Sequence, residues 1–132
     1  MSDTIVLDSN AIIALFHGER RIAELMGESF RIVIPAVVCG EIDSGTQGNT
    51  ARERKEREAF SLMLANPKVF VHPVTRASGA FYAKVFAYVK SVGKPIPTND
   101  IWIAAATLEI GGLIVTNDRH LLSLPLMRTA GF

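Results

Sequence analysis

The sequence has little cysteine and little net charge. Cys39 is the single cysteine among 132 residues, so the chain cannot form an internal disulfide bond. Its position within VVCGE favours a small core residue. The 14 lysines and arginines against 13 acids give a formal net charge of +1. This balance excludes a global field that attracts nucleic acid, so any site for a polyanion has to be a local patch.

Long apolar runs are also missing. The longest, near Ile101, is too short for the roughly 20 residues that cross a bilayer. No basic region followed by an apolar one marks a signal peptide, so we expect a soluble, cytoplasmic protein. At 48% hydrophobic and 20% charged residues, the chain has enough apolar surface for a core. Without repeats or a linker, residues 1–132 are predicted to form a single domain.

Short β-branched segments alternate with longer helical patterns along the chain. Strands are predicted at residues 4–7, 31–34, 69–72 and 113–116, and the tail, residues 126–132, favours an additional edge strand. Helices are predicted at residues 9–18, 19–27, 35–42, 51–64, 76–92, 99–110 and 119–124. Uniformly apolar strands alternating with helices indicate an α/β fold, a mostly parallel central sheet with helices on both faces.

Three aspartates fall at the predicted edge where ligands bind in such sheets. Asp8 directly follows the first strand, and Asp118 follows the fourth one closely. Asp100 lies in the first turn of the helix that leads into the fourth strand, and a crossover helix starts at that same edge. If the first and fourth strands are neighbours, about 4.8 Å apart, Asp8 and Asp118 face each other.

A glutamate joins them by a different argument. Glu41 lies on a helix that starts at the same edge, on the face that also carries Val38 and Ile42. A carboxylate on a core-facing stripe needs a partner. Asp43 points away from that face and reads as solvent-facing charge.

Taken singly, the three aspartates are explained as helix caps or first-turn acids, and Glu41 as a side chain that reaches water. Taken together, four carboxylates at one edge repel each other unless a cation neutralises them. Ligands that are all oxygen favour Mg²⁺ or Mn²⁺ over zinc. Carboxylate-held Mg²⁺ suits phosphodiester hydrolysis, which then needs no serine, cysteine or histidine nucleophile.

Four segments in order, LDSNAIIAL, VVCGEI, PTNDIWIAAATLEIGG and LIVTNDRHL, resemble the PIN-domain nucleases. The resemblance covers essentially the whole chain and is closest to the VapC-type toxins of toxin–antitoxin pairs. It implies a parallel sheet with the first strand central, Mg²⁺- or Mn²⁺-dependent endoribonuclease activity, frequent homodimers, and inhibition by a small antitoxin.

The resemblance also implies roles for particular residues. The family's acidic site corresponds to Asp8, Glu41, Asp100 and Asp118, and Asn10 and Thr116 match polar positions that support it. Ser9 stands where threonine is common and Gly40 where alanine is common. Neither difference affects the predicted metal ligands.

Basic and aromatic side chains offer weaker candidates for contacts with RNA. Arg119, beside Asp118, is the best single candidate for a phosphate contact. The segment RERKERE alternates in charge sign and favours a solvated face with salt bridges, although Arg52, Arg54 or Lys55 can reach phosphates or an antitoxin. Aromatic residues at helical spacing favour a core or dimer interface over base stacking: Phe81, Tyr82, Phe86 and Tyr88. His120 is near the predicted site but is interpreted as a surface residue.

Two other functions compete with a metal-dependent nuclease. A phosphatase with an aspartate nucleophile also begins with an aspartate after its first strand, but needs a second aspartate two residues on, where Asn10 stands. A non-catalytic PIN-like domain that binds RNA or protein typically lacks some of the acids, whereas all four are present here. The sequence does not identify which RNA would be cut.

Overall fold

Five short strands pair side by side in one parallel sheet, in the order β3–β2–β1–β4–β5. The computed structural model describes residues 4–132. The strands are β1 (Thr4–Leu7), β2 (Arg31–Pro35), β3 (Val69–His72), β4 (Leu113–Val115) and β5 (Arg128–Ala130). The predicted α/β class, the four main strands and the extra edge strand are confirmed. The sheet is parallel throughout rather than mostly so.

Seven helices connect the strands within the described residues. They are α1 (Ser9–Phe16), α2 (Arg20–Glu28), α3 (Ala36–Gly45), α4 (Ala51–Leu64), α5 (Ser78–Val92), α6 (Thr98–Ile110) and α7 (Arg119–Leu122). The predicted end of α3 at residue 42 was wrong, because the helix runs through Asp43 to Gly45. The predicted start of α5 was also too early. The Ser78 hydroxyl accepts a hydrogen bond from the Thr75 N–H, so residues 75–77 form a turn before the helix.

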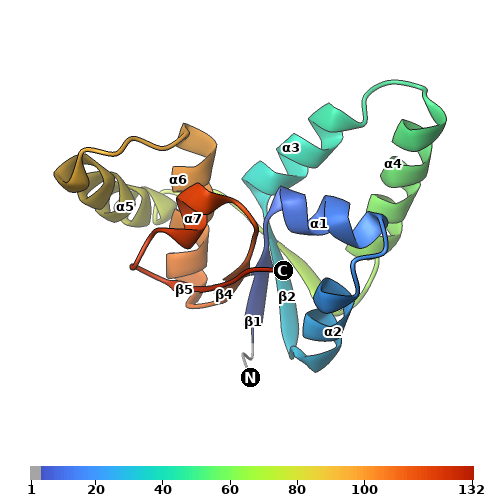
Figure 1. The fold of residues 1–132 in the computed structure, drawn as a ribbon, viewed down its shortest axis with the longest axis horizontal. Helices are drawn as coiled ribbons and strands as arrows, with labels where there is room; N and C mark the ends of the chain where they lie inside the picture. The colour runs from blue at the N-terminus through green and yellow to red at the C-terminus, as the bar shows by residue number, and fades with distance from the viewer. Residues whose placement is uncertain (1–3) are drawn as a thin grey trace.

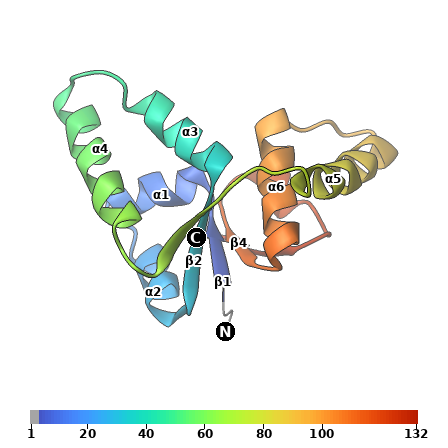
Figure 2. The same ribbon diagram turned by 180° about the vertical axis from the view of Figure 1, so that it is seen from behind.

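The helices form two layers that enclose the sheet. Helices α1 to α4 lie on one side and α5 to α7 on the other, with the strands between them (Figure 1). In the view from behind, the chain leaves β3 and crosses to α5 on the opposite side (Figure 2). This crossing follows from the strand order, because the chain moves outward from β1 to β3 and then returns to the other side of β1.

The core lies on both faces of the central strands. Ile5, Val6 and Leu7 of β1 are fully buried, as expected for a strand covered on both sides. The small residues Ala104 and Ala105 of α6 are also fully buried. Gly112 leads into β4, where a Cβ atom would lie 2.9 Å from a methyl group of Val6, so glycine permits β4 to approach β1 this closely.

The neighbouring strands β1 and β4 determine where the acidic residues meet. Leu7 pairs with Val115, and the Asp8 N–H donates to the Val115 carbonyl at 3.3 Å. The expected adjacency of these two strands is therefore confirmed. Strand order reverses between them, which is where parallel sheets place ligands. Among residues 4–132, no helix combines the length and apolar character needed to span a bilayer.

Candidate metal centre

Asp8 is the most buried of the four acids, with 3% of its surface exposed, and it caps the N-terminus of α1. Its Oδ1 accepts a hydrogen bond from the Ser9 N–H at 2.8 Å. Its Oδ2 accepts from the Thr116 hydroxyl at 2.7 Å and from the Asn10 amide at 3.2 Å. Both carboxylate oxygens of Asp8 are therefore held by neighbouring donors, which fixes the orientation of the side chain.

Thr116 and Asn10 connect the end of β1 to the loop after β4. The fully buried Thr116 hydroxyl donates to Asp8 and accepts the Asp118 N–H at 2.9 Å. The Asn10 carbonyl oxygen accepts the Asn117 N–H at 3.1 Å. The two residues that the family resemblance pointed to thus lie between Asp8 and the segment that carries Asp118.

Glu41 reaches the same edge from α3. Its Oε1 accepts a hydrogen bond from the Ser9 hydroxyl at 2.8 Å, and its Oε2 accepts from the Asn99 amide at 3.3 Å. Ser9 is adjacent to Asp8, and Asn99 is adjacent to Asp100. The half-buried Glu41 carboxylate is therefore placed between the two neighbouring segments that carry those aspartates.

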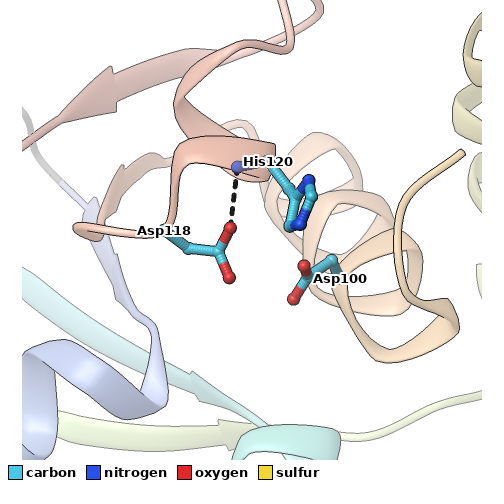
Figure 3. Close-up of side chains that lie close together, drawn as sticks. All are labelled: Asp100, Asp118 and His120. Atoms are coloured by element: carbon cyan, nitrogen blue, oxygen red, sulfur yellow. Dashed lines mark hydrogen bonds between the residues drawn. The ribbon is translucent and has the colours of Figure 1, made fainter. Parts of the chain in front are cut away.

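Asp100 and Asp118 come from the start of α6 and the start of α7. Ligand atoms of Asp100, Asp118 and His120 all lie within 4.8 Å of one another. Figure 3 shows the two carboxylates and the imidazole ring converging on one space. Asp118 caps α7, because its Oδ1 accepts the His120 N–H at 2.7 Å. Asp100 is 7% exposed, and its Oδ2 is buried without a hydrogen-bond partner among residues 4–132.

His120 is the residue that sequence reasoning missed. We interpreted it as a surface residue, but it is half-buried and its ring lies beside Asp100 and Asp118 (Figure 3). The available signal was its spacing, since it follows the capping Asp118 by two residues. That spacing places both side chains on the first turn of the same short helix, next to α6.

Burial and the neighbouring carboxylates raise the pKa of two of the four acids, Asp100 and Asp8. Burial, followed by repulsion from Asp118, Asp8 and Glu41, raises the pKa of Asp100 to about 7. Burial also raises the pKa of Asp8, and the hydrogen bonds from Thr116 and Ser9 partly offset this effect. The site therefore concentrates negative charge in a poorly solvated place.

A divalent cation fits this arrangement. In the described part of the chain the buried Asp100 Oδ2 lacks a donor, and an unpaired buried carboxylate oxygen is costly. Oxygen ligands suit Mg²⁺ or Mn²⁺, while the nearby imidazole adds a nitrogen that softer metals prefer. Asp100 and Asp118 are the pair placed best to hold the ion, with Asp8 and Glu41 on the adjoining side.

Comparison with known proteins assigns the family. A family model described as PIN domain matches residues 5–125, most of the chain. The chain belongs to the PIN domain family. This agrees with the resemblance seen in the sequence motifs.

The named relatives of this PIN domain include a ribonuclease and a member of a family of toxin–antitoxin systems. It is 25% identical over 124 residues to ribonuclease VapC1 of Haemophilus influenzae strain R2866, covering 86% of this chain and 85% of that protein. Similar folds occur in VapBC2 of Rickettsia felis bound to a promoter DNA fragment (TM-score 0.81, 16% identity, 98% of both chains). VapBC-5 of Mycobacterium tuberculosis, a member of the VapBC family of toxin–antitoxin systems, is also similar (TM-score 0.73, 22% identity, 98% of both chains).

Two of the basic candidates on α4 of the PIN domain are already engaged. Arg52 forms a 2.7 Å ion pair with Glu56, which also contacts His17 at 3.3 Å. Glu56 is 4% exposed, so interpreting this segment as a solvated face was wrong at that position. Arg54 donates to the Asn49 carbonyl. The α4 helix packs against α1, which buries Glu56 together with Phe60.

The remaining basic candidates are differently placed. Lys55 is exposed on α4 and lines a cavity with His17 and Arg52, away from Asp100 and Asp118. Arg119 is exposed on α7 between Asp118 and His120. Of the four basic residues singled out from the sequence, Arg119 alone adjoins the Asp100 and Asp118 side of the site.

Proposed function

We propose that this PIN domain is a divalent-metal-dependent endoribonuclease. The observation that carries the proposal is the buried Asp100 Oδ2, which has no donor among residues 4–132 and lies beside Asp118 in a cluster of four acids. The similarity to ribonuclease VapC1 supports RNA as the substrate.

Asp8, Glu41, Asp100 and Asp118 would hold Mg²⁺ or Mn²⁺, with His120 at the border of the site. When bound, such an ion polarises a phosphodiester, activates water and stabilises the leaving oxygen. The residues of the chain fix the position of these ligands. Thr116 and Asn10 orient Asp8, and Ser9 and Asn99 orient Glu41, so the carboxylates are arranged before substrate arrives.

The partners belong to the same proposal. We propose an antitoxin as the protein partner, because a related fold is that of VapBC-5, a member of a toxin–antitoxin family. A homodimer is also proposed, and Phe86, 47% exposed on α5, is the residue whose burial would support it. Cytoplasmic action on RNA is the corresponding expectation. Co-purification with the product of a neighbouring reading frame would test for the antitoxin.

Cleavage of a fluorescent single-stranded RNA tests the catalytic claim. The purified protein should cleave it internally with added Mg²⁺ or Mn²⁺, and EDTA should abolish the reaction reversibly. Asp43→Asn is the matched control, because that exposed acid lies on the same helix as Glu41 but outside the cluster. RNA binding without cleavage under every metal would favour the non-catalytic alternative. A phosphoryl group trapped on Asp8 would favour the phosphatase.

A further inference from the structure

A cavity of about 480 Å³ adjoins the metal centre on the side of α5 and α7. Its walls come from α5, the connection between α5 and α6, and α7 with the residues that follow it. Lining residues that matter here are Tyr88, Val92, Lys94, Ile96, Arg119 and His120. Because the His120 ring also lies within 4.8 Å of ligand atoms of Asp100 and Asp118, the cavity and the metal centre share a wall.

The charge of this cavity is opposite to that of the metal centre. Its lining contains Lys94 and Arg119 and no carboxylate. Within residues 4–132, neither of these side chains forms an ion pair or a hydrogen bond. Arg52 differs, because Glu56 neutralises it. Unpaired cations beside a cluster of acids are suited to bind an RNA phosphate. This phosphate would be the neighbour, along the strand, of the phosphate held at the metal centre.

The rest of the lining is apolar and aromatic. Val92 and Ile96 supply apolar walls, and the half-buried Tyr88 supplies a ring on which a base can stack. The volume lies in the range of about 300–1,000 Å³ typical of pockets that hold small organic molecules. A nucleotide therefore matches the cavity: its base fits the apolar wall with Tyr88, and its phosphate lies toward Lys94 and Arg119.

We propose that this cavity binds one unpaired nucleotide of a single-stranded RNA, next to the phosphate that is cleaved. The inference rests on the proposed nuclease function and assigns the cavity residues Tyr88, Lys94 and Arg119 to substrate binding. A base in a duplex is paired and stacked, so it has to leave the helix before it can enter. Few neutral polar groups line the cavity, so it should discriminate weakly between the four bases. It should discriminate strongly between single-stranded and duplex RNA.

Binding of fluorescein-labelled oligouridylate in EDTA, measured by anisotropy, tests the site without cleavage. Arg119→Ala and Lys94→Ala should each weaken binding about tenfold and reduce the salt slope of binding by about 0.7 per lost phosphate contact. Tyr88→Ala should weaken binding about tenfold without changing that slope. It should also reduce the preference for oligouridylate over its duplex with oligoadenylate. Lys90→Ala is the control, since Lys90 is exposed on α5 and does not line the cavity.

Affinities of the Arg119 and Lys94 variants equal to that of Lys90→Ala would overturn the proposal. Both side chains are exposed, so these variants are expected to fold even if Tyr88→Ala does not. The nuclease function fails separately, if the wild type cleaves no RNA with Mg²⁺ or Mn²⁺. In that case loss of oligouridylate binding by Arg119→Ala would still support the nucleotide site. If the wild type cleaves RNA but all variants keep its KM and affinity, the cavity is not the site.

Discussion

The two halves of the candidate metal centre differ in how their carboxylates are satisfied. On one half, both oxygens of Asp8 and both oxygens of Glu41 accept hydrogen bonds. On the other half, Asp118 caps α7, while the buried Oδ2 of Asp100 has no donor among the described residues. The first half is therefore arranged by hydrogen bonds from the protein, whereas the second half leaves a buried carboxylate oxygen that the proposed ion would satisfy. The buried position of Asp100 beside the other carboxylates, which leaves its Oδ2 without a donor among the described residues, also raises its pKa to about 7.

Replacing one aspartate from each half gives the largest expected effect. Asp8→Asn and Asp100→Asn should each reduce cleavage at least about 100-fold, because each removes a ligand charge. Their stabilities in EDTA should diverge. Asp8→Asn loses about 1–3 kcal/mol, because an amide cannot accept from Ser9, Asn10 and Thr116 together. Asp100→Asn should match or exceed the wild type, because a repelled buried charge is removed.

Thermal unfolding with and without EDTA measures this divergence. Compared with the wild type, Asp8→Asn should unfold at a lower temperature and Asp100→Asn at the same or a higher temperature. Cleavage should be strongly reduced in both variants. Equal destabilisation by the two substitutions would contradict the division into a satisfied half and an unsatisfied half.

The hydroxyl of Thr116 gives the next largest effect, because it joins the two halves through Asp8 and the Asp118 N–H. Thr116→Val preserves the shape and should reduce metal affinity or cleavage about 10–100-fold. Thr107→Val is the control, since within residues 4–132 that buried hydroxyl bonds only to the Ile103 carbonyl of α6. Titration of Mn²⁺ followed by cleavage rates would separate the two variants. Equal losses would show that Thr116 acts through packing alone.

The same comparison explains how far the sequence could predict this site. The acids Asp8, Asp100 and Asp118 follow strands or begin a helix, and parallel topology brings such positions to one edge. Glu41 was predicted from its position on a helical face, and its hydrogen bonds with Ser9 and Asn99 place it at the same edge. The site residues therefore depend on spacing and strand adjacency, which a sequence expresses.

Contacts between distant elements are what the sequence did not express. The ring of His120 reaches Asp100 because α7 packs against α6, and the two-residue spacing from Asp118 alone does not reveal that contact. Glu56 lies in a run of alternating charges that is typical of an exposed helix, yet packing of α4 against α1 buries it beside His17. Both errors concern which side of a short or charged helix faces the protein.

The raised pKa of Asp100 predicts a pH dependence of stability without metal. Its folded-state pKa of about 7 exceeds the ordinary value of 3.8, so between these values the folded state binds more protons than the unfolded state. Stability in EDTA should therefore fall as pH rises through this window and level off above about 7. Asp100→Asn should flatten the curve.

Added Mg²⁺ should reverse this trend, because the ion competes with the proton for the same carboxylate. The stabilisation by Mg²⁺ should be larger above the pKa of about 7 than well below it. Unfolding by urea across this pH range, with and without Mg²⁺, measures both effects. A wild-type curve in EDTA with the same slope as that of Asp100→Asn would exclude a raised pKa for Asp100.

The smallest effect concerns the cations beside each half. Arg52 lines a cavity with Ser9 and Glu41 but is paired with the buried Glu56, whereas Arg119 beside Asp118 has no partner within residues 4–132. Arg52→Ala should therefore lower stability by about 1 kcal/mol, because Glu56 loses a donor, and change the affinity for oligouridylate less than twofold. Lys55→Ala, on the same helix without such a pair, should change neither quantity. If Arg52→Ala weakened RNA binding as strongly as Arg119→Ala, pairing with Glu56 would not withhold Arg52 from RNA, and both cations would have to be assigned to the bound strand.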